Sequence, residues 1–247
     1  MDRMIYVAMA GAQQLFSQQA VVAHNLANAG TPGYKADTTA FRVAPVVGPG
    51  LSTRAYAVTS TPGANHAAGS IQKTGRELDV AIQGDGFFAV QTPDGNEAYT
   101  RNGSFQVSPD GMLTTSSGLT VVGDGGPISV PPDSNLTIAK DGTVSLTTYG
   151  QSAANVTTLG RLKLVNPDKA NLVKGQDGLF RLSGGGDAEA DENVTLVSGS
   201  LEESNVSAVS TMIDMIQLAR QFDLSMRLLQ DADADAQRAN QLLSINP

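Results

Sequence analysis

Two long stretches of regularly spaced apolar residues, one at each end of the chain, constrain the fold more than any other sequence feature. In the first stretch, six of seven positions spaced alternately by 3 and 4 residues are apolar: Ile5, Ala8, Ala12, Leu15, Gln19, Val22 and Leu26. Such a narrow apolar seam is typical of a helix that packs against another helix. Gly30 suits a helix end and Pro32 cannot continue a helix, so we expect the N-terminal helix to stop here.

The C-terminal stretch follows the same rule over a longer span. Eight of its nine seam positions are apolar: Met215, Leu218, Phe222, Ser225, Leu229, Ala232, Ala236, Ala239 and Leu243. Ser200 and Glu203 have the spacing of a capping box, which predicts a helix that starts near Leu201. A continuous helix of about 40 residues would be about 60 Å long.

The middle of the chain has a β pattern. Short β-branched runs predict strands at 38–47, 78–83, 87–92, 119–123, 136–139, 143–148 and 159–165. Asp-Gly pairs, which favour hairpin turns, follow at Asp85, Asp94, Asp110, Asp124, Asp141 and Asp177. These signals predict an antiparallel all-β central domain.

The expected fold class is therefore α+β, with N- and C-terminal helices that form a coiled-coil-like helical domain. Residues 44–70 contain Pro45, Pro49 and Pro62 among several glycines and predict an extended linker. The expected divisions are an N-terminal helix (1–35), the linker arm (36–70), the all-β domain (71–199) and the C-terminal helix (200–247).

Composition excludes several classes of protein. The net charge is −8 and no basic run occurs, which argues against a general nucleic-acid binder. The chain has no cysteine, which excludes disulfides, thiol catalysis and cysteine-ligated zinc. Glutamines interrupt the N-terminal apolar positions, and no stretch reaches the roughly 18 apolar residues of a membrane span. We expect a chain that is soluble or that is exported without a cleaved signal peptide.

Catalytic patterns are also missing from the sequence. The only histidines are His24 and His66, which are isolated from each other and belong to no zinc motif. Gly84-Asp85-Gly86 leads into a predicted strand, so it indicates a turn and not a dinucleotide-binding loop. The densest acidic group follows three glycines and favours a solvated surface loop: Asp187, Glu189, Asp191 and Glu192. We expect no catalytic, metal or cofactor site.

Each narrow apolar seam needs a second helix to cover it. The two seams can cover each other, either within a helical hairpin that packs only on its own β-domain or within a larger assembly. The small side chains of Ala232, Ala236 and Ala239 favour close packing between helices. Head-to-tail contacts that do not close would then produce a helical filament or tube.

Three separate motifs carry a family resemblance. The first is Asn25-Leu26-Ala27-Asn28-Ala29-Gly30-Thr31-Pro32-Gly33-Tyr34-Lys35. The middle of the chain adds Leu78–Ile82, Gly84–Phe88 and Tyr99–Phe105, and the end adds Leu201–Val206 and Arg220–Asp223. In this order they resemble the bacterial flagellar rod and hook proteins. The opening residues and the length are similar to the proximal-rod members, with the distal-rod members as the alternative.

The resemblance implies a non-enzymatic structural subunit, without cofactors, that the flagellar type III apparatus exports and that polymerises in the periplasm. Its partners would be further copies, other rod subunits and the export apparatus; no nucleic acid, no small-molecule substrate and no direct membrane insertion are expected. The terminal helices would form the inner tube around the export channel, and torque would pass through these contacts to the hook.

Two sets of site residues follow from these expectations. The assembly seam comprises Ile5, Leu15, Val22, Leu26, Met215, Leu218, Phe222, Leu229 and Leu243. The family signature, which should direct the chain from the first helix into the β-domain, comprises Asn25, Leu26, Asn28, Thr31, Pro32, Gly33 and Tyr34. A secreted fibre protein with a coiled-coil stalk and a carbohydrate-acting β enzyme remain alternatives.

Overall fold

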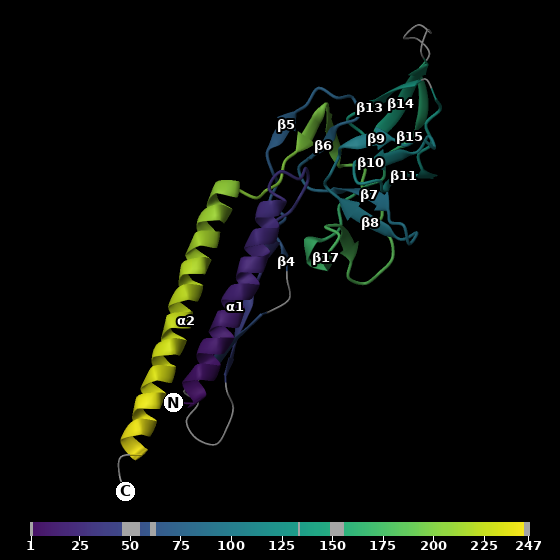
Figure 1. The fold of residues 1–247 in the computed structure, drawn as a ribbon. Coiled ribbons are helices and arrows are strands. Elements are labelled where there is room, and N and C mark those ends of the chain that lie inside the picture. Colours follow the sequence, from purple (N-terminus) through teal and green to yellow (C-terminus); the bar gives the residue numbers. More distant parts are fainter. Residues whose placement is uncertain (1, 46–54, 60–62, 133, 149–155, 245–247) are drawn as a thin grey trace. The chain divides into compact units, whose positions relative to one another are not determined.

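The computed structural model describes residues 2–45, 55–59, 63–132, 134–148 and 156–244 of the 247-residue chain (Figure 1). Its described part contains two α-helices, α1 (Asp2–Ala27) and α2 (Ala208–Ser244), with the strands between them in the sequence. Every pair of described strands is antiparallel. The fold is α+β with two terminal helices, as the sequence predicted.

The chain forms two compact units. The helical unit consists of Met1–Ala27, Asp37–Ala64 and Ser207–Pro247, and the β unit consists of Asn28–Ala36 and Asn65–Val206. The predicted divisions fall elsewhere, at 35/36, 70/71 and 199/200. Most of the signature motif therefore belongs to the β unit, whereas much of the expected linker belongs with the helices.

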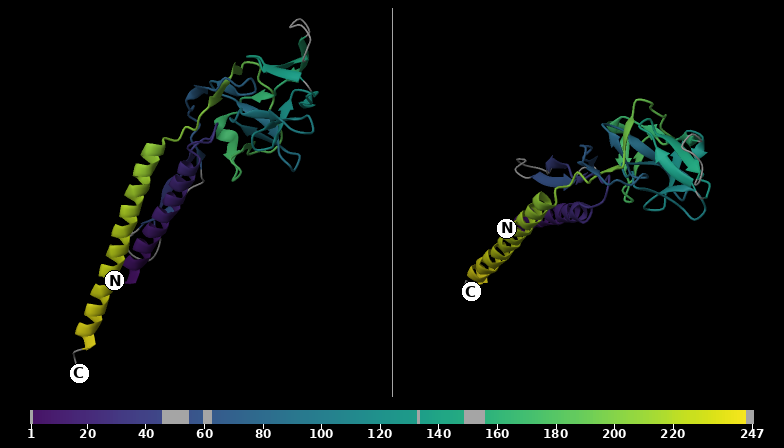
Figure 2. Two further views of the ribbon diagram at one scale, coloured as in Figure 1. Left: turned by 45° about the horizontal axis from the view of Figure 1, so that its top comes forward. Right: turned by 90° about the horizontal axis from the view of Figure 1, so that it is seen from above.

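In the helical unit, α1 and α2 lie side by side and run in opposite directions (Figures 1 and 2). Strand β2 (Phe41–Pro45) pairs with β3 (Ala55–Thr59), and β1 (Asp37–Thr38) pairs with β4 (Gly63–Ala64). Much of the described part of the expected linker thus forms strand pairs, while Pro49 and Pro62 lie outside the described residues. Neither described helix is both long and apolar enough to span a membrane.

The expected start of the second helix near Leu201 is wrong. Residues Ser200–Glu202 form strand β20, which pairs with β5 (Ile71–Lys73), and the Glu203 N–H donates to the Ser70 carbonyl over 2.8 Å. This ladder satisfies the backbone groups that a helical turn would have used. Helix α2 begins at Ala208, seven residues after Leu201, and the Ser207 carbonyl accepts the Thr211 N–H over 2.9 Å.

The main sheet of the β unit has nine strands, with β17-β18-β8-β7-β11-β10-β9 in line, β12 beside β11 and β16 beside β7. A second sheet has the order β13-β14-β15, and β19 pairs with β6. The bounds are β6 (Val80–Gln83), β7 (Phe87–Gln91), β8 (Glu97–Thr100), β9 (Phe105–Val107), β10 (Leu113–Thr115), β11 (Thr120–Gly123), β12 (Gly126–Pro127), β13 (Ser134–Ile138), β14 (Thr143–Thr148), β15 (Val156–Arg161), β16 (Leu164–Val165), β17 (Leu172–Lys174), β18 (Phe180–Leu182) and β19 (Thr195–Ser198). A short 3₁₀ helix, η1 (Lys169–Asn171), precedes β17.

Five of the six Asp-Gly pairs connect antiparallel neighbours, as expected: Asp94, Asp110, Asp124, Asp141 and Asp177. Asp85 is the exception, because β6 and β7 flank it but pair with other strands. The turn at Asp85 has a different role, described below.

One apolar cluster holds the β unit together. It contains sixteen buried side chains from both larger sheets, from β6 and β19 and from residues just outside these strands: Val80, Ile82, Phe88, Phe105, Leu113, Val121, Ile128, Val130, Leu136, Ile138, Val144, Leu146, Leu162, Leu164, Val194 and Leu196. The rings of Phe88 and Phe105 meet edge to face at 5.2 Å, a favoured aromatic geometry. The β unit therefore has a core of its own.

Candidate assembly site

The predicted seam positions are at least half-buried wherever the structure describes their side chains. On α1, Ala12 is buried, and Leu15, Val22 and Leu26 are half-buried. The seam positions of α2 that are described are also half-buried: Met215, Leu218, Phe222, Ser225, Leu229 and Ala232. Ile5 and Leu243 lie in the helices, at positions whose side chains the structure does not describe.

Helix α2 also has a second apolar face that the sequence analysis missed. Six large apolar side chains of α2 are 50–71% exposed: Val209, Met212, Ile213, Ile216, Leu224 and Leu228. Val209, Ile213 and Ile216 follow the same 4,3 spacing as the seam, and Leu224 lies eight residues after Ile216, close to the same face. This spacing is present in the sequence, but it is shorter and less regular than the spacing of the seam. A run of exposed apolar side chains on one helix marks a surface that a partner covers.

Asn25 fixes the end of α1 to the strand that follows. Its Nδ2 donates to the Asp37 carbonyl over 2.9 Å, and its Oδ1 accepts the Asp37 N–H over 2.8 Å. His24 Nδ1 lies 2.7 Å from Asp37 Oδ2. Two adjacent residues of the last helical turn thus hold the first residue of β1.

The signature residues that follow form a tight turn within the β unit. The Thr31 N–H donates to the Asn28 carbonyl over 3.1 Å, and the Tyr34 N–H donates to the Thr31 carbonyl over 3.2 Å. Gly33 has φ +69°, and its N–H donates to the Glu202 carbonyl over 2.8 Å. A Cβ at Gly33 would overlap the backbone of Arg101, so both the left-handed conformation and the close approach require glycine.

Tyr34 is buried, and Lys174 caps it. The Lys174 Nζ lies 3.9 Å from the centre of the Tyr34 ring and donates to the Lys35 carbonyl over 2.7 Å. The cation therefore contributes both a cation–π contact and a hydrogen bond to the signature turn.

The centre of this arrangement is the carboxylate of Glu202, which is 1% exposed. Its Oε1 accepts Lys35 Nζ over 2.7 Å and the Gly69 N–H over 2.9 Å, and its Oε2 accepts Arg101 Nε over 2.7 Å. Both cations are almost fully buried, at 3% and 4% exposure. We name this group (Lys35, Arg101 and Glu202) the buried charge triad.

Arg101 also explains the exceptional turn at Asp85. Its Nη1 and Nη2 donate to the carbonyls of Gly86 and Gly84, each over 2.8 Å. The triad thus joins the N-terminal motif, two of the three central segments and the C-terminal motif that carry the family resemblance. Sequence analysis found the motifs but could not predict an ion pair that spans 167 residues.

Asn205 makes a second connection in the same region. Its Oδ1 accepts the Ala36 N–H over 2.8 Å, and its Nδ2 donates to the carbonyls of Asn65 and Ala67 over 2.7 and 3.0 Å. One amide side chain therefore connects three segments of the β unit.

Burial and pairing oppose each other in the triad. Burial raises the pKa of Glu202, but the hydrogen bond from Lys35 and the charge of Arg101 outweigh it, so the pKa lies below its usual value. Burial lowers the pKa of Lys35 more than the Glu202 carboxylate raises it. The carboxylate is therefore held ionised, and its loss would leave two cations without compensation.

The acidic group after the glycines offers no comparable site. The cleft beside Asp191 and Glu192 measures about 70 Å³, well below the roughly 300 Å³ of a small ligand site. No group of three or more potential metal ligands occurs within the described part of the chain. His66 packs against the rings of Phe87 and Phe180, with centroids 6.4 and 5.3 Å away.

Comparison with known proteins gives a consistent result along the chain. Family models match three segments: "flagella basal body rod protein" at residues 5–35, "flagellar hook protein FlgE/F/G D1 domain" at 81–146 and "flagellar basal body rod FlgEFG protein C-terminal" at 197–242. The flagellar basal-body rod protein FlgF of Escherichia coli K12 is 49% identical, and that of Salmonella typhimurium LT2 is 48% identical, each over the whole of both chains. FlgG of Buchnera aphidicola from Acyrthosiphon pisum is 35% identical over 72% of this chain and 69% of its own.

Proposed function

The chain belongs to the FlgF family of flagellar basal-body rod proteins, and from this premise we propose that it forms part of the proximal rod. Its role is that of a structural subunit of the basal-body rod, which assembles with other flagellar components. The higher identity to these FlgF relatives than to the FlgG relative favours the proximal rod over the distal rod.

The observation that carries the proposal is the pair of apolar surfaces on α2. One surface is the half-buried seam, and the other is the row of exposed side chains that includes Ile213 and Ile216, at 50% and 55% exposure. A helix with apolar residues on two opposite faces needs partners on both. Only one of these faces is occupied by α1, so the second face is available to a neighbouring subunit.

In this role the terminal helices would pack in a coiled-coil-like manner and enclose the export channel. The β unit, which has its own core, would form the outer layer, and torque would pass through the subunit contacts toward the hook. We further propose periplasmic assembly after passage through the type III export apparatus, without a cleaved signal peptide. The absence of cysteine is compatible with this route.

A non-enzymatic role fits the described residues better than the alternatives. A secreted fibre protein with a coiled-coil stalk would not need the rod motifs that this chain carries from end to end. A carbohydrate-acting enzyme would need paired carboxylates in a cleft, and the cleft beside Asp191 is small.

The test is incorporation into basal bodies in a strain whose own gene for the chain is deleted. We expect the wild-type chain to restore swimming and to copurify with the basal body. Ile216→Asp should abolish both, because it places a charge on the exposed face of α2. The matched control is Val173→Asp on β17, where the side chain is equally exposed, at 53%, but lies in the β unit.

The possible outcomes distinguish a failure of the rod role from a failure of the assembly surface. A wild-type chain that restores swimming without entering the basal body would refute a rod subunit. Equal incorporation of both aspartate variants would refute the exposed face of α2 as an assembly surface.

A further inference from the structure

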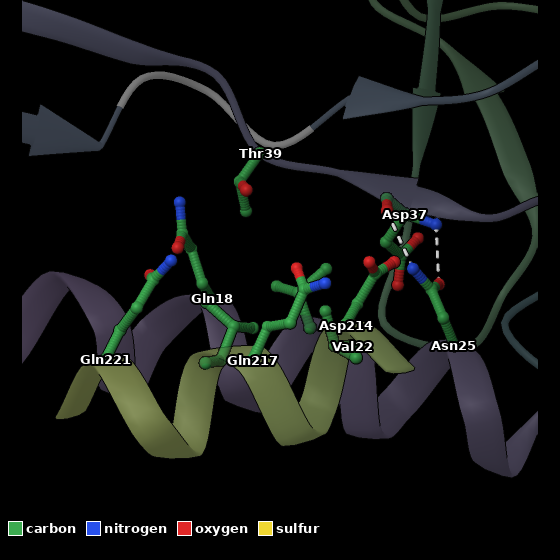
Figure 3. A pocket seen from close by; sticks show the side chains of 10 residues that line it. Gln18, Val22, Asn25, Asp37, Thr39, Asp214, Gln217 and Gln221 are labelled. Carbon is green, nitrogen blue, oxygen red and sulfur yellow. Dashed lines mark hydrogen bonds between the residues drawn. The ribbon is translucent and has the colours of Figure 1, made fainter. Parts of the chain in front are cut away.

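A groove between α1 and α2 is lined mostly by polar side chains, unlike the apolar seam. It has a volume of about 280 Å³ and lies beside β1 (Figure 3). Val21, Val22 and Leu218 supply apolar surface. The polar lining residues are Gln18, Asn25, Asp37, Thr39, Asp214, Gln217 and Gln221, and Figure 3 shows side chains of both helices directed toward Asp37 and Thr39.

The groove is rich in acceptors and poor in cations. Two carboxylates and four amide side chains line it, and its lining contains no lysine or arginine. Asp37 is held by His24 and Asn25, whereas Asp214 is exposed and forms no ion pair with a described lysine or arginine. A long side chain with an apolar stem and a cationic end would match both the apolar surface and the acceptors.

The outer face of α2 carries such a side chain. The spacing of Val209, Ile213, Ile216 and Leu224 leaves one place in the row, four residues after Ile216, and Arg220 occupies it. Arg220 is exposed and has no ion pair in the described part of the chain. A partner that covers the apolar row must also bury Arg220, which is costly unless the partner supplies acceptors.

Arg220 makes no ion pair with Asp214 of its own chain. It follows Asp214 by six residues, which places the two side chains about 120° apart around the helix axis. The guanidinium and the Asp214 carboxylate therefore lie on different faces of α2. When Arg220 of one copy fills the groove of a second, Arg220 of the second copy still needs the groove of a third. This head-to-tail arrangement repeats without closing when the rotation does not complete a ring.

We propose that α2 of one copy lies with its outer face on the groove of a second copy, and that Arg220 enters the groove and pairs with Asp214. This inference rests on the proposed function, because it names the partner of the exposed face as a further copy of the chain. The guanidinium would donate to the Asp214 carboxylate and to the glutamine oxygens. The two apolar neighbours, Ile216 and Leu224, would cover the rim.

The absence of cysteine from the chain allows a direct test by crosslinking. One variant carries Gln217→Cys in the groove, and a second, with a different tag, carries Leu224→Cys on the outer face beside Arg220. Both are expressed together in the deletion strain, and isolated basal bodies are oxidised. The control replaces Leu224→Cys by Val173→Cys, an equally exposed site in the β unit.

We expect mixed-tag dimers from the 217–224 pair and at least ~tenfold fewer from the control pair. Arg220→Glu in the Leu224→Cys chain should lower the yield by at least ~tenfold, because it places three carboxylates together. Asp214→Arg in the Gln217→Cys chain should restore it. Arg227→Glu, the same charge change at the end of the row, should leave most of the yield.

Each of the other outcomes refutes a different part of the inference. Basal bodies that contain both variants but yield no 217–224 dimer would refute the contact and leave the rod role intact. An unchanged yield with Arg220→Glu, or a loss that Asp214→Arg does not restore, would refute the ion pair. Absence of the wild-type chain from basal bodies would refute the rod role and this contact with it.

Discussion

The helical unit and the β unit differ in how completely they bury their apolar side chains. In the β unit, large side chains such as Phe88 and Tyr99 are completely buried. In the described part of α1 and α2, only Ala12 and Thr211 are buried, and the large apolar side chains of the seam are half-buried. Hydrophobic stabilisation scales with the apolar area removed from water. The β unit can therefore be stable alone, whereas the helices gain much of their stability from partners.

The two units also treat charge differently. The β unit buries Lys35, Arg101 and Glu202 together, whereas Arg220 on α2 is exposed and unpaired among the described residues. A buried triad specifies one arrangement, since each member needs the others. An exposed cation such as Arg220, in a row of apolar side chains, can form its ion pair with another molecule. The comparison predicts that triad changes affect folding and that α2 changes affect assembly.

The largest effect on folding is expected from Glu202→Gln. The amide keeps the shape but removes the negative charge, so Lys35 and Arg101 remain buried without a counter-ion. We expect the free energy of unfolding of the β unit to fall by about 3–5 kcal/mol. Urea unfolding followed by tyrosine circular dichroism measures it. The matched control is Glu203→Gln, an exposed neighbour bonded to Ser70, which should change it by less than about 0.5 kcal/mol.

The pH dependence sharpens this prediction. The pKa of Glu202 is lowered in the fold from its ordinary 4.5, so its stabilisation is fully present above that pH and is lost as the pH falls through the lowered value. Glu202→Gln should lack this loss. Wild type and variant should therefore converge in acid, and a constant difference down to pH 2 would contradict the assignment.

Gly33→Val should have the next largest effect. Valine resists φ +69°, which alone costs about 1–2 kcal/mol, and its Cβ would overlap the backbone of Arg101. We expect a total loss of about 2–4 kcal/mol in the unfolding free energy of the β unit. Gly30→Ala is the matched control, because a Cβ there meets nothing within 4 Å. Equal stability of the two variants would show that the turn relaxes.

The sequence predicted the parts of the fold that local pattern determines. The 3,4 spacing gave both helices, and the Asp-Gly pairs gave five of the hairpins. Strand β14 was predicted with its observed bounds, Thr143–Thr148. These features depend on side-chain periodicity and on turn conformations, which neighbouring residues decide.

The sequence did not reveal very short strands or features that depend on distant partners. The three-residue strands β9, β10, β17 and β18 were missed, because so short a run has no measurable period and is held by its neighbours. The predicted start of α2 was wrong because Ser200–Glu202 pairs with β5 and forms a strand. The buried charge triad could not be predicted because its members are far apart in the chain, and the groove because it needs both helices.

Tyr99→Phe should have a smaller effect that depends on pH. The Tyr99 hydroxyl accepts the Ala188 N–H over 2.6 Å, so the variant should lose about 1–2 kcal/mol at pH 7. Burial raises the pKa of Tyr99 from 10.0 to about 12. Wild type therefore loses up to about 3 kcal/mol as the pH rises from 10 to 12, and the variant does not. Calorimetry between pH 7 and 11.5 should show the difference shrinking, and parallel curves would contradict the buried hydroxyl.

The smallest effect on the β unit is expected from Leu229→Asp, which should have the largest effect on assembly. Leu229 lies in the seam of α2 and is half-buried. A carboxylate there would have to be covered by another helix without a cation, which opposes packing. Because the helices belong to a separate unit, the melting of the β unit should change by less than the error of calorimetry. Val173→Asp, at an exposed position of β17 in the β unit, is the control and should swim normally. Normal swimming with Leu229→Asp would refute the seam, and a lowered melting temperature of the β unit would refute the independence of the two units.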